Sequence, residues 1–208
     1  MHLVFIHGWG FGPDIWAPVL ERLDYRMKTT CVDLGFFQPA NLLDDIPPRS
    51  VIAGHSLGFL WLLKHGLKFS PDAVISISGF DRFTPHVDPR IVRAMKKGVE
   101  RNVDRQLQSF WDNCGVADYK PASQPDNKRL IEGLDWLETL DGREELAGLD
   151  CPKLVLAARG DKIVPEPMSR DIWTGQDILW SETGGHMLPV TRPDWTAQKI
   201  TEFINELR

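Results

Sequence analysis

The chain has 208 residues, of which 42% are hydrophobic and 25% charged, a length and composition that suit one globular domain with a full hydrophobic core. Its formal net charge of −5 argues against a generally basic surface for nucleic acid. No stretch is apolar and long enough to span a membrane, and the first residues lack the basic lead and apolar run of an export signal. We therefore expect a cytoplasmic protein that binds neither nucleic acid nor membrane.

The chain contains three cysteines, Cys31, Cys114 and Cys151. Their odd number and wide spacing argue against a disulfide framework and against a zinc site. We expect reduced thiols and no bound metal.

Strand and helix patterns alternate along the first 80 residues. Short apolar runs closed by glycine or by polar residues predict buried strands, whereas apolar residues at helical spacing predict the segments between them. The predicted strands are 2–6, 27–32, 50–54 and 72–78, and the predicted helices are 13–23 and 57–69. The fourth strand is rich in β-branched residues, as strands of parallel sheets are.

Residues 81–140 interrupt this alternation with a polar, charged and helical pattern. We interpret them as a helical insertion over one end of the sheet, and call them the cap. Strands resume at 153, with a short helix, a last strand in "DILWSETGGH" and a closing helix after it. The alternation predicts an α/β fold, a mostly parallel sheet flanked by helices, in a single domain of residues 1–208.

A serine lies between two glycines where the third strand passes into a helix. Gly54-His55-Ser56-Leu57-Gly58 matches the G-x-S-x-G pattern of a nucleophile elbow, a sharp turn that lifts the serine hydroxyl above the sheet. The glycines let strand and helix pack closely, and the serine takes a strained backbone conformation. We therefore expect Ser56 to be a catalytic nucleophile.

A serine hydroxyl is a weak nucleophile at neutral pH, so it requires a histidine base held by a carboxylate. His186 follows the last predicted strand in a Gly-Gly loop and is the expected base. Asp161, at the end of the preceding strand, is the expected orienting carboxylate and completes the chain order Ser, Asp, His. Asp33 and Glu182 are alternatives, but Asp33 precedes the serine and Glu182 lies very near His186 in sequence.

The first predicted strand ends in the glycine-rich segment "HGWGFG", residues 7–12. Its glycines let backbone amides turn toward the serine, and the backbone N–H groups of Trp9 and Leu57 are the expected donors of an oxyanion hole. The sequence contains no phosphate-binding loop, metal-ligand spacing or dinucleotide fingerprint. We therefore expect no cofactor.

Four segments together carry a family resemblance: "FIHGWGFGPDIW", "GHSLG", "GLDWLETLDGREELAGLDCPKLVLAARGDKIVP" and "GGHMLPVTRPDW". Over nearly the whole chain they resemble the α/β-hydrolase superfamily, and more narrowly the pimeloyl-acyl-carrier-protein methyl ester esterases of biotin synthesis. The resemblance implies an α/β-hydrolase fold in which Ser56, Asp161 and His186 form the triad, with Trp9 and Leu57 at the oxyanion hole. Compared with that family, the usual first two strands are missing, the segment between the second and third strands is short, and the cap is compact.

Members of this family cleave a methyl ester carried on an acyl-carrier protein, and several hydrolyse short p-nitrophenyl esters. With the triad, this leads us to expect a serine carboxylesterase that works through an acyl-enzyme on a small-molecule or carrier-bound ester, and we expect a monomer. Fold and triad do not select the scissile bond. A small-molecule esterase or thioesterase of unknown substrate, and a non-catalytic ligand-binding protein of the same fold, remain alternatives.

The cap sequence from Asp88 predicts one long helix to Phe110, since Asp88 suits the N-cap and Pro89 the first helical position. At 100° per residue, one face is basic and the opposite face is apolar. We expect the apolar face (Ile91, Val92, Met95, Val99 and Val103) to cover the active site and the basic face (Arg90, Arg93, Lys97, Arg101 and Arg105) to dock an acidic carrier protein.

Overall fold

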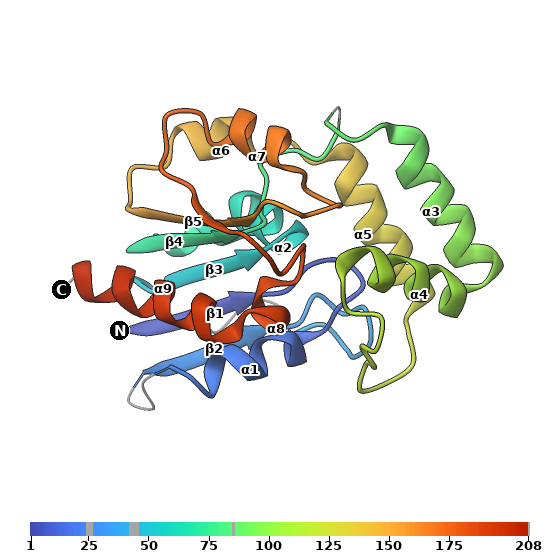
Figure 1. Ribbon diagram of the computed structural model, residues 1–208, viewed down its shortest axis with the longest axis horizontal. Helices are drawn as coiled ribbons and strands as arrows, with labels where there is room; N and C mark the ends of the chain where they lie inside the picture. The colour runs from blue at the N-terminus through green and yellow to red at the C-terminus, as the bar shows by residue number, and fades with distance from the viewer. Residues whose placement is uncertain (24–26, 42–45, 85, 208) are drawn as a thin grey trace.

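The computed structural model describes every residue except 24–26, 42–45, 85 and 208. Within the described chain, strands form one sheet in the order β2-β1-β3-β4-β5-β6, with every neighbouring pair parallel (Figure 1). The strands are β1 (His2–Ile6), β2 (Lys28–Val32), β3 (Val51–His55), β4 (Ala73–Ile77), β5 (Lys153–Ala158) and β6 (Leu179–Ser181). The predicted parallel sheet is confirmed, and the first four strands lie within one residue of their predicted bounds.

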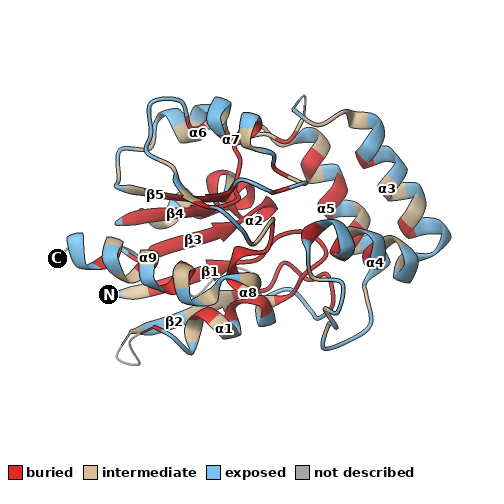
Figure 2. Cartoon of the chain, in the orientation of Figure 1, coloured by how far each residue is buried: buried red, intermediate tan, exposed pale blue. Residues whose placement is uncertain are grey.

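Burial follows the position of each strand in the sheet. Every residue of the central strands β3 and β4 is buried, whereas the edge strand β2 is exposed at Lys28 and Thr29 (Figure 2). Parallel strands covered by helices on both faces are apolar throughout, which explains the unbroken apolar runs of β3 and β4.

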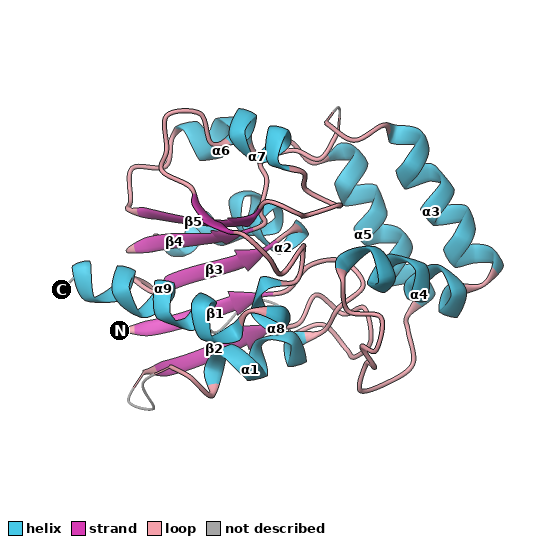
Figure 3. Ribbon diagram, in the orientation of Figure 1, coloured by secondary structure: helices cyan, strands magenta, loops and turns pink. Residues whose placement is uncertain are grey.

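Helices flank both faces of the sheet (Figure 3). One group of helices, α1, α8 and α9, packs together on one face, and α2 with its continuation, α6 and α7 lie on the other. Their bounds are α1 (Ala17–Leu20), α2 (Leu57–Trp61), α3 (Pro89–Arg101), α4 (Val103–Cys114), α5 (Asn127–Thr139), α6 (Arg143–Ala147), α7 (Glu166–Ile172), α8 (Leu188–Thr191) and α9 (Pro193–Glu206).

Two predicted helices change type along their length. The segment from Pro13 begins as the 3₁₀ turn η1 (Pro13–Trp16) before α1, and α2 continues as the π-helical η2 (Leu62–Gly66) and the 3₁₀ turn η3 (Leu67–Phe69). No helix in the described residues is long and apolar enough to cross a membrane. Each of the three cysteines is free.

The long cap helix predicted from Asp88 to Phe110 is wrong. The helix stops at Arg101, and Asn102, in an extended conformation (φ −164°, ψ 95°), separates α3 from α4. The Asn102 side chain accepts a hydrogen bond from the N–H of Arg105 at 2.9 Å. Asparagine competes for backbone groups in this way at helix starts, so one sequence run yields two helices.

The order of the strands fixes where a site can form. The chain adds β2 on one side of β1 and then β3 on the other, which makes the carboxyl ends of β1 and β3 a topological switch point. Open parallel sheets bind ligands at such points. Helices α3, α4 and α5 of the cap lie beyond this same end of the sheet (Figure 1).

Candidate active site

Ser56 occupies the turn between β3 and α2 that the sequence predicts. Its backbone has φ 54° and ψ −124°, a region that a residue with a side chain rarely adopts. The N–H of Ser56 donates to the carbonyl of Ile77 at 3.0 Å, which ties the strained turn to β4. Strain of this kind persists only where the surroundings hold it in place.

The two glycines of the elbow allow the helix to approach the sheet. A methyl group at Gly54 would lie 2.5 Å from Cα of Phe59 in α2, and one at Gly58 would overlap the carbonyl oxygens of Ile6 and His7 at the end of β1. Both clashes are with backbone, which cannot move aside cheaply. Glycine is therefore required at these two positions by close packing.

His186 and Asp161 are paired in the interior. The Nδ1–H of His186 donates to Oδ2 of Asp161 at 2.8 Å, and the other carboxylate oxygen accepts the N–H groups of Ile163 at 2.8 Å and Val164 at 2.9 Å. Burial opposes the charge on Asp161, but His186 and these amides outweigh it and hold the pKa of Asp161 below its usual value. The carboxylate is thus ionised and fixed in place.

Nε2 of His186 is buried and has no hydrogen-bond partner among the described residues. With Nδ1 as donor to Asp161, Nε2 of the neutral ring is the bare nitrogen that can accept a proton. The loop before it turns sharply, with φ of 109° at Gly184 and 58° at Gly185. The strand β6 before this loop ends at Ser181 and is shorter than the sequence suggests.

The two alternative carboxylates lie elsewhere. Asp33 accepts the N–H of Gly35 at 2.8 Å and approaches Nε2 of His7 at 3.3 Å, whereas Glu182 pairs with Arg159 at 3.0 Å. Neither carboxylate bonds to His186, so of the three candidate carboxylates it is Asp161 that the structure brings to this imidazole.

His55 is a site residue that the sequence reasoning missed. Its Nε2–H donates to the carbonyl oxygen of His186 at 2.9 Å, and the two rings are 4.9 Å apart between centroids. Burial, followed by the nearby His186, lowers the pKa of His55 to about 3, so the ring is neutral. The residue before the nucleophile therefore holds the backbone of the proposed base. Its position beside Ser56 was a signal that could have suggested this.

The two residues expected at the oxyanion hole lie in the loop after β1 and at the start of α2. The N–H groups of Trp9 and Leu57 are both buried and donate to no group in the described part of the chain. Leu57 lies in the first turn of α2, where backbone N–H groups lack helical partners. Both residues line one cavity together with Ser56.

His7 fixes the direction of the Trp9 amide. Its Nε2 accepts the N–H of Leu34 at 2.9 Å, so Nδ1 carries the proton and donates to the carbonyl of Gly8 at 2.9 Å. In a planar trans peptide the carbonyl of one residue and the N–H of the next point in opposite directions. Holding the Gly8 oxygen on His7 therefore turns the Trp9 N–H away from it.

A cavity of about 530 Å³ opens beside Ser56 under the cap. Its wall is mainly apolar and includes Phe80, Phe83, Ile91, Met95, Phe110 and Leu137. Ile91 and Met95 come from the predicted apolar face of α3, while Val92 and Val99 of that face are buried against the protein. The size suits a small organic substrate. Within the described residues, no three metal-binding side chains gather into a cluster.

The predicted basic face is divided by the helix break. Arg90, Arg93, Lys97 and Arg101 are exposed on α3, but Arg105 lies on α4. Arg90 is bonded to Asp88, and Arg93 lies 3.9 Å from Glu138. Lys97, Arg101 and Arg105 make no ion pair with a described residue.

A sequence profile of the alpha/beta hydrolase family matches residues 3–199, and the chain therefore belongs to this family. It is 30% identical, over 98% of its own length and 95% of the relative's, to a Legionella pneumophila (strain Corby) protein named pimeloyl-[acyl-carrier protein] methyl ester esterase. A protein of the same name from Vibrio vulnificus (strain CMCP6) is 26% identical, with 97% of this chain and 93% of the relative aligned.

Solved structures share the fold at lower identity. An esterase from Exiguobacterium antarcticum superposes with a TM-score of 0.82 and 13% identity, covering 99% of this chain and 92% of that one. A malate-bound thermophilic esterase from Thermogutta terrifontis superposes with a TM-score of 0.78 and 17% identity, covering 100% of this chain and 90% of that one. The expected α/β-hydrolase fold and the family resemblance are confirmed, and the chain is a carboxylic ester hydrolase.

Proposed function

We propose that Ser56, His186 and Asp161 form a catalytic triad that hydrolyses an ester through an acyl-enzyme. Nε2 of His186 takes the hydroxyl proton as Oγ of Ser56 attacks the carbonyl carbon. The observation that carries the proposal is the buried imidazole of His186, held by an ionised Asp161 on one nitrogen and unpartnered on the other among the described residues.

The remaining steps use the same groups. The oxyanion of the tetrahedral intermediate accepts the N–H groups of Trp9 and Leu57, each worth about 3 kcal/mol when preorganised. The bond to the leaving alkoxide then breaks, and the imidazolium of His186 returns its proton to form the alcohol. A water molecule attacks the acyl-enzyme with His186 as base, which releases the acid and restores Ser56.

The substrate we propose is the methyl ester of a pimeloyl chain carried on an acyl-carrier protein. Two observations support it: the names of the relatives aligned over nearly the whole chain, and the apolar cavity of about 530 Å³ beside Ser56. The methyl ester would lie at Ser56, the methylene chain along the apolar wall, and the carrier outside the cap.

The charge on the outer face of the cap favours the proposal that the substrate is carried on an acidic protein. Lys97, Arg101 and Arg105 are exposed and, among the described residues, unpaired, although the whole chain is negatively charged. Such cations steer an acidic partner and set its register. We propose these three residues as the centre of the docking surface, with Arg90 and Arg93 at its margin because each already lies near a carboxylate.

A comparison of matched substrates tests the function. The carrier-bound pimeloyl methyl ester should be hydrolysed with a much higher kcat/KM than the same chain carried as a thioester of a small thiol. Methanol should be released and the thioester left intact. Equal kcat/KM for both would replace the proposal with a small-molecule esterase, and release of the thiol would replace it with a thioesterase.

A fluorophosphonate probe tests the mechanism independently of substrate. It should label the native enzyme at Ser56 and leave Ser56→Ala unlabelled. No labelling of the folded parent protein would contradict the serine mechanism and favour a ligand-binding protein.

A further inference from the structure

The loop after β1 is bonded to the cap at three successive points. Strand pairing ends at Ile6, so polar groups in residues 7–12 need other partners. The Trp9 indole N–H donates to the carbonyl of Leu130 at 2.8 Å, the Trp111 indole N–H to the carbonyl of Gly10 at 2.8 Å, and the N–H of Gly12 to the Tyr119 hydroxyl at 3.2 Å. All three bonds join segments more than 100 residues apart in the chain.

The packing between loop and cap is equally close. Gly10 has a positive φ of 70°, and a methyl group there would lie 3.2 Å from the ring of Phe110 in α4. The Phe110 ring also meets Trp9 edge to face at 4.8 Å between centroids. From α5, Gly133 lies so close to Trp9 that a methyl group would come within 2.8 Å of its indole. The loop is thus enclosed between α4 and α5.

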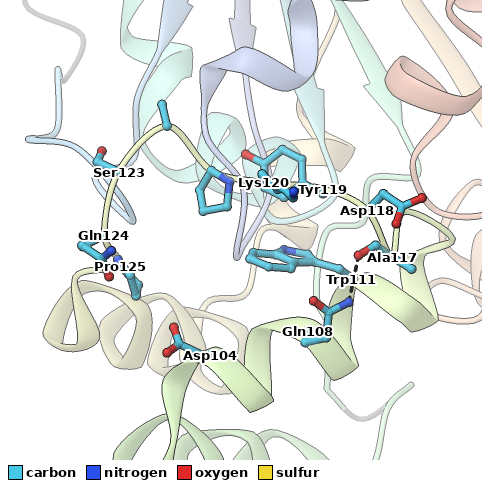
Figure 4. A pocket seen from close by; sticks show the side chains of 12 residues that line it. Asp104, Gln108, Trp111, Ala117, Asp118, Tyr119, Lys120, Ser123, Gln124 and Pro125 are labelled. Atoms are coloured by element: carbon cyan, nitrogen blue, oxygen red, sulfur yellow. Dashed lines mark hydrogen bonds between the residues drawn. The ribbon is translucent and has the colours of Figure 1, made fainter.

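Trp111 and Tyr119 form one unit on the outer side of this loop. Their rings meet at 5.2 Å between centroids, and the Tyr119 hydroxyl donates in turn to Asp14 at 2.9 Å. Burial and the neighbouring Asp14 raise the pKa of Tyr119 above its usual value, so it remains a hydroxyl donor. Figure 4 shows both rings in the wall of a second cavity, about 730 Å³, between α4 and the loop that follows it.

We propose that Trp111 and Tyr119 are positioning residues for the oxyanion hole. His7 holds the peptide before Trp9 from the side of the sheet, and Trp111 and Tyr119 hold the following turn from the side of the cap. The Trp9 N–H therefore has its direction fixed from both sides. The cap serves catalysis as a scaffold as well as a cover. This proposal rests on the serine mechanism above.

The physical reason is preorganisation. A donor stabilises the transition state only if it already points at the developing oxyanion, and a misplacement of about 1 Å can cost about a hundredfold in rate. Gly10 has no side chain to restrict its backbone. Without the Trp111 bond to its carbonyl, rotation at Gly10 would shift the backbone of Trp9, and the Trp9 N–H would move with it.

Two conservative variants test the proposal. Trp111→Phe removes the indole donor, and Tyr119→Phe removes a single oxygen. With p-nitrophenyl acetate, a substrate too small to fill the cavity, each should lower kcat by about tenfold and leave KM within about twofold. Titration of Ser56 with the fluorophosphonate counts active sites, so that kcat refers to competent enzyme only.

An oxyanion mimic separates positioning from general structural support. A trifluoromethyl ketone adds the Ser56 oxygen to its carbonyl carbon and places an oxyanion in the hole. Its affinity should fall by the same factor as kcat, whereas the affinity for acetate, the product, should not change. The control Trp136→Phe removes another cap indole, half-buried on α5, and should leave all these values as in the parent.

Several results would overturn the proposal. Unchanged kcat in folded Tyr119→Phe and Trp111→Phe would do so, as would a change in KM alone or an equal loss in Trp136→Phe. Tyr119→Phe removes only one oxygen atom and should therefore fold like the parent. The proposal can still be tested with this variant if Trp111→Phe does not fold. Failure of the serine mechanism would look different, because the parent enzyme itself would not be labelled at Ser56.

Discussion

At the scale of single residues, the three members of the proposed triad should fail in different ways. Ser56→Ala and His186→Ala should each lower kcat by about four to six orders of magnitude, with the double variant no worse than either. Asp161→Asn should lower kcat by a factor of about 10⁴, because an amide facing Nδ1 favours the wrong imidazole tautomer. Steady-state ester hydrolysis measures all four variants. Losses that multiply in the double variant would show that the residues do not act as one unit.

His55 should make the protein sensitive to acid. Its pKa is lowered to about 3 in the fold and is about 6.5 in an unfolded chain. Between these two pKa values, His55 is therefore protonated in the unfolded state and neutral in the folded state. The free energy of unfolding should fall as pH drops from about 6.5 to about 3, by up to about 1.4 kcal/mol per pH unit. Denaturant unfolding across this range measures it.

Two substitutions at His55 separate its charge from its hydrogen bond. His186, Asp161 and His7 all influence this imidazole, so the comparison must keep them unchanged. His55→Gln cannot take up a proton but retains an N–H donor, and its stability should lose the extra dependence on acid while activity remains. His55→Leu leaves the carbonyl of His186 without its donor and should lower kcat. The same pH slope in His55→Gln and the parent would refute this role.

At the scale of secondary-structure elements, the crossing of β3 and α2 depends on the elbow glycines. Gly54→Ala places a methyl group against the backbone of Phe59 and should destabilise the protein by about 3 kcal/mol or more. Gly160→Ala is the matched control, since nothing lies within 4 Å of its added carbon. Thermal unfolding compares the two. Equal midpoints would mean that helix and strand can separate without cost.

The break between α3 and α4 also has a functional consequence at this scale. A continuous helix would have carried Arg105 on the same face as Arg101. Instead, capping at Asn102 lets α4 take its own direction, which brings Trp111 to the carbonyl of Gly10. The α3 half of the run provides most of the exposed cations and part of the cavity wall, whereas α4 provides Arg105, Phe110 of the cavity wall and the Trp111 bond to the loop after β1.

At the scale of the whole molecule, surface charge should affect the KM for the carrier-bound ester but not the KM for small esters. Charge reversal at Lys97, Arg101 and Arg105 should raise KM for the carrier-bound ester several-fold and leave p-nitrophenyl acetate unaffected. Rising salt concentration should lower the activity of the parent enzyme on the carrier-bound ester but not on the small ester. The reason is that surface charges are screened beyond about 10 Å at 0.1 M salt. Lys68→Glu, an exposed lysine between α2 and β4, is the control. Unchanged kinetics in the triple variant at low salt would remove the docking surface.

The sequence alone determined the features that depend on neighbours in the chain. The strands, the elbow around Ser56 and the order of Ser56, Asp161 and His186 are all written in patterns a few residues long. Such patterns report local backbone preference and burial. They also carried the family resemblance, whose segments combine the loops after β1, β3, β5 and β6 with the helices α5, α6 and α8.

Tertiary structure decided what depends on groups distant in sequence. The His55 bond to His186 spans 131 residues and the Trp111 bond to Gly10 spans 101, and no local pattern encodes such a pair. The helix stop at Asn102 was missed because amphipathic periodicity continues through it. Whether Lys97 pairs with a carboxylate likewise depends on the fold: Asp135 and Glu138 of α5 pair with Lys96, and none of the described residues pairs with Lys97. Buried polar groups must form hydrogen bonds with whichever groups the fold places beside them. These partners can therefore be identified only from the tertiary structure.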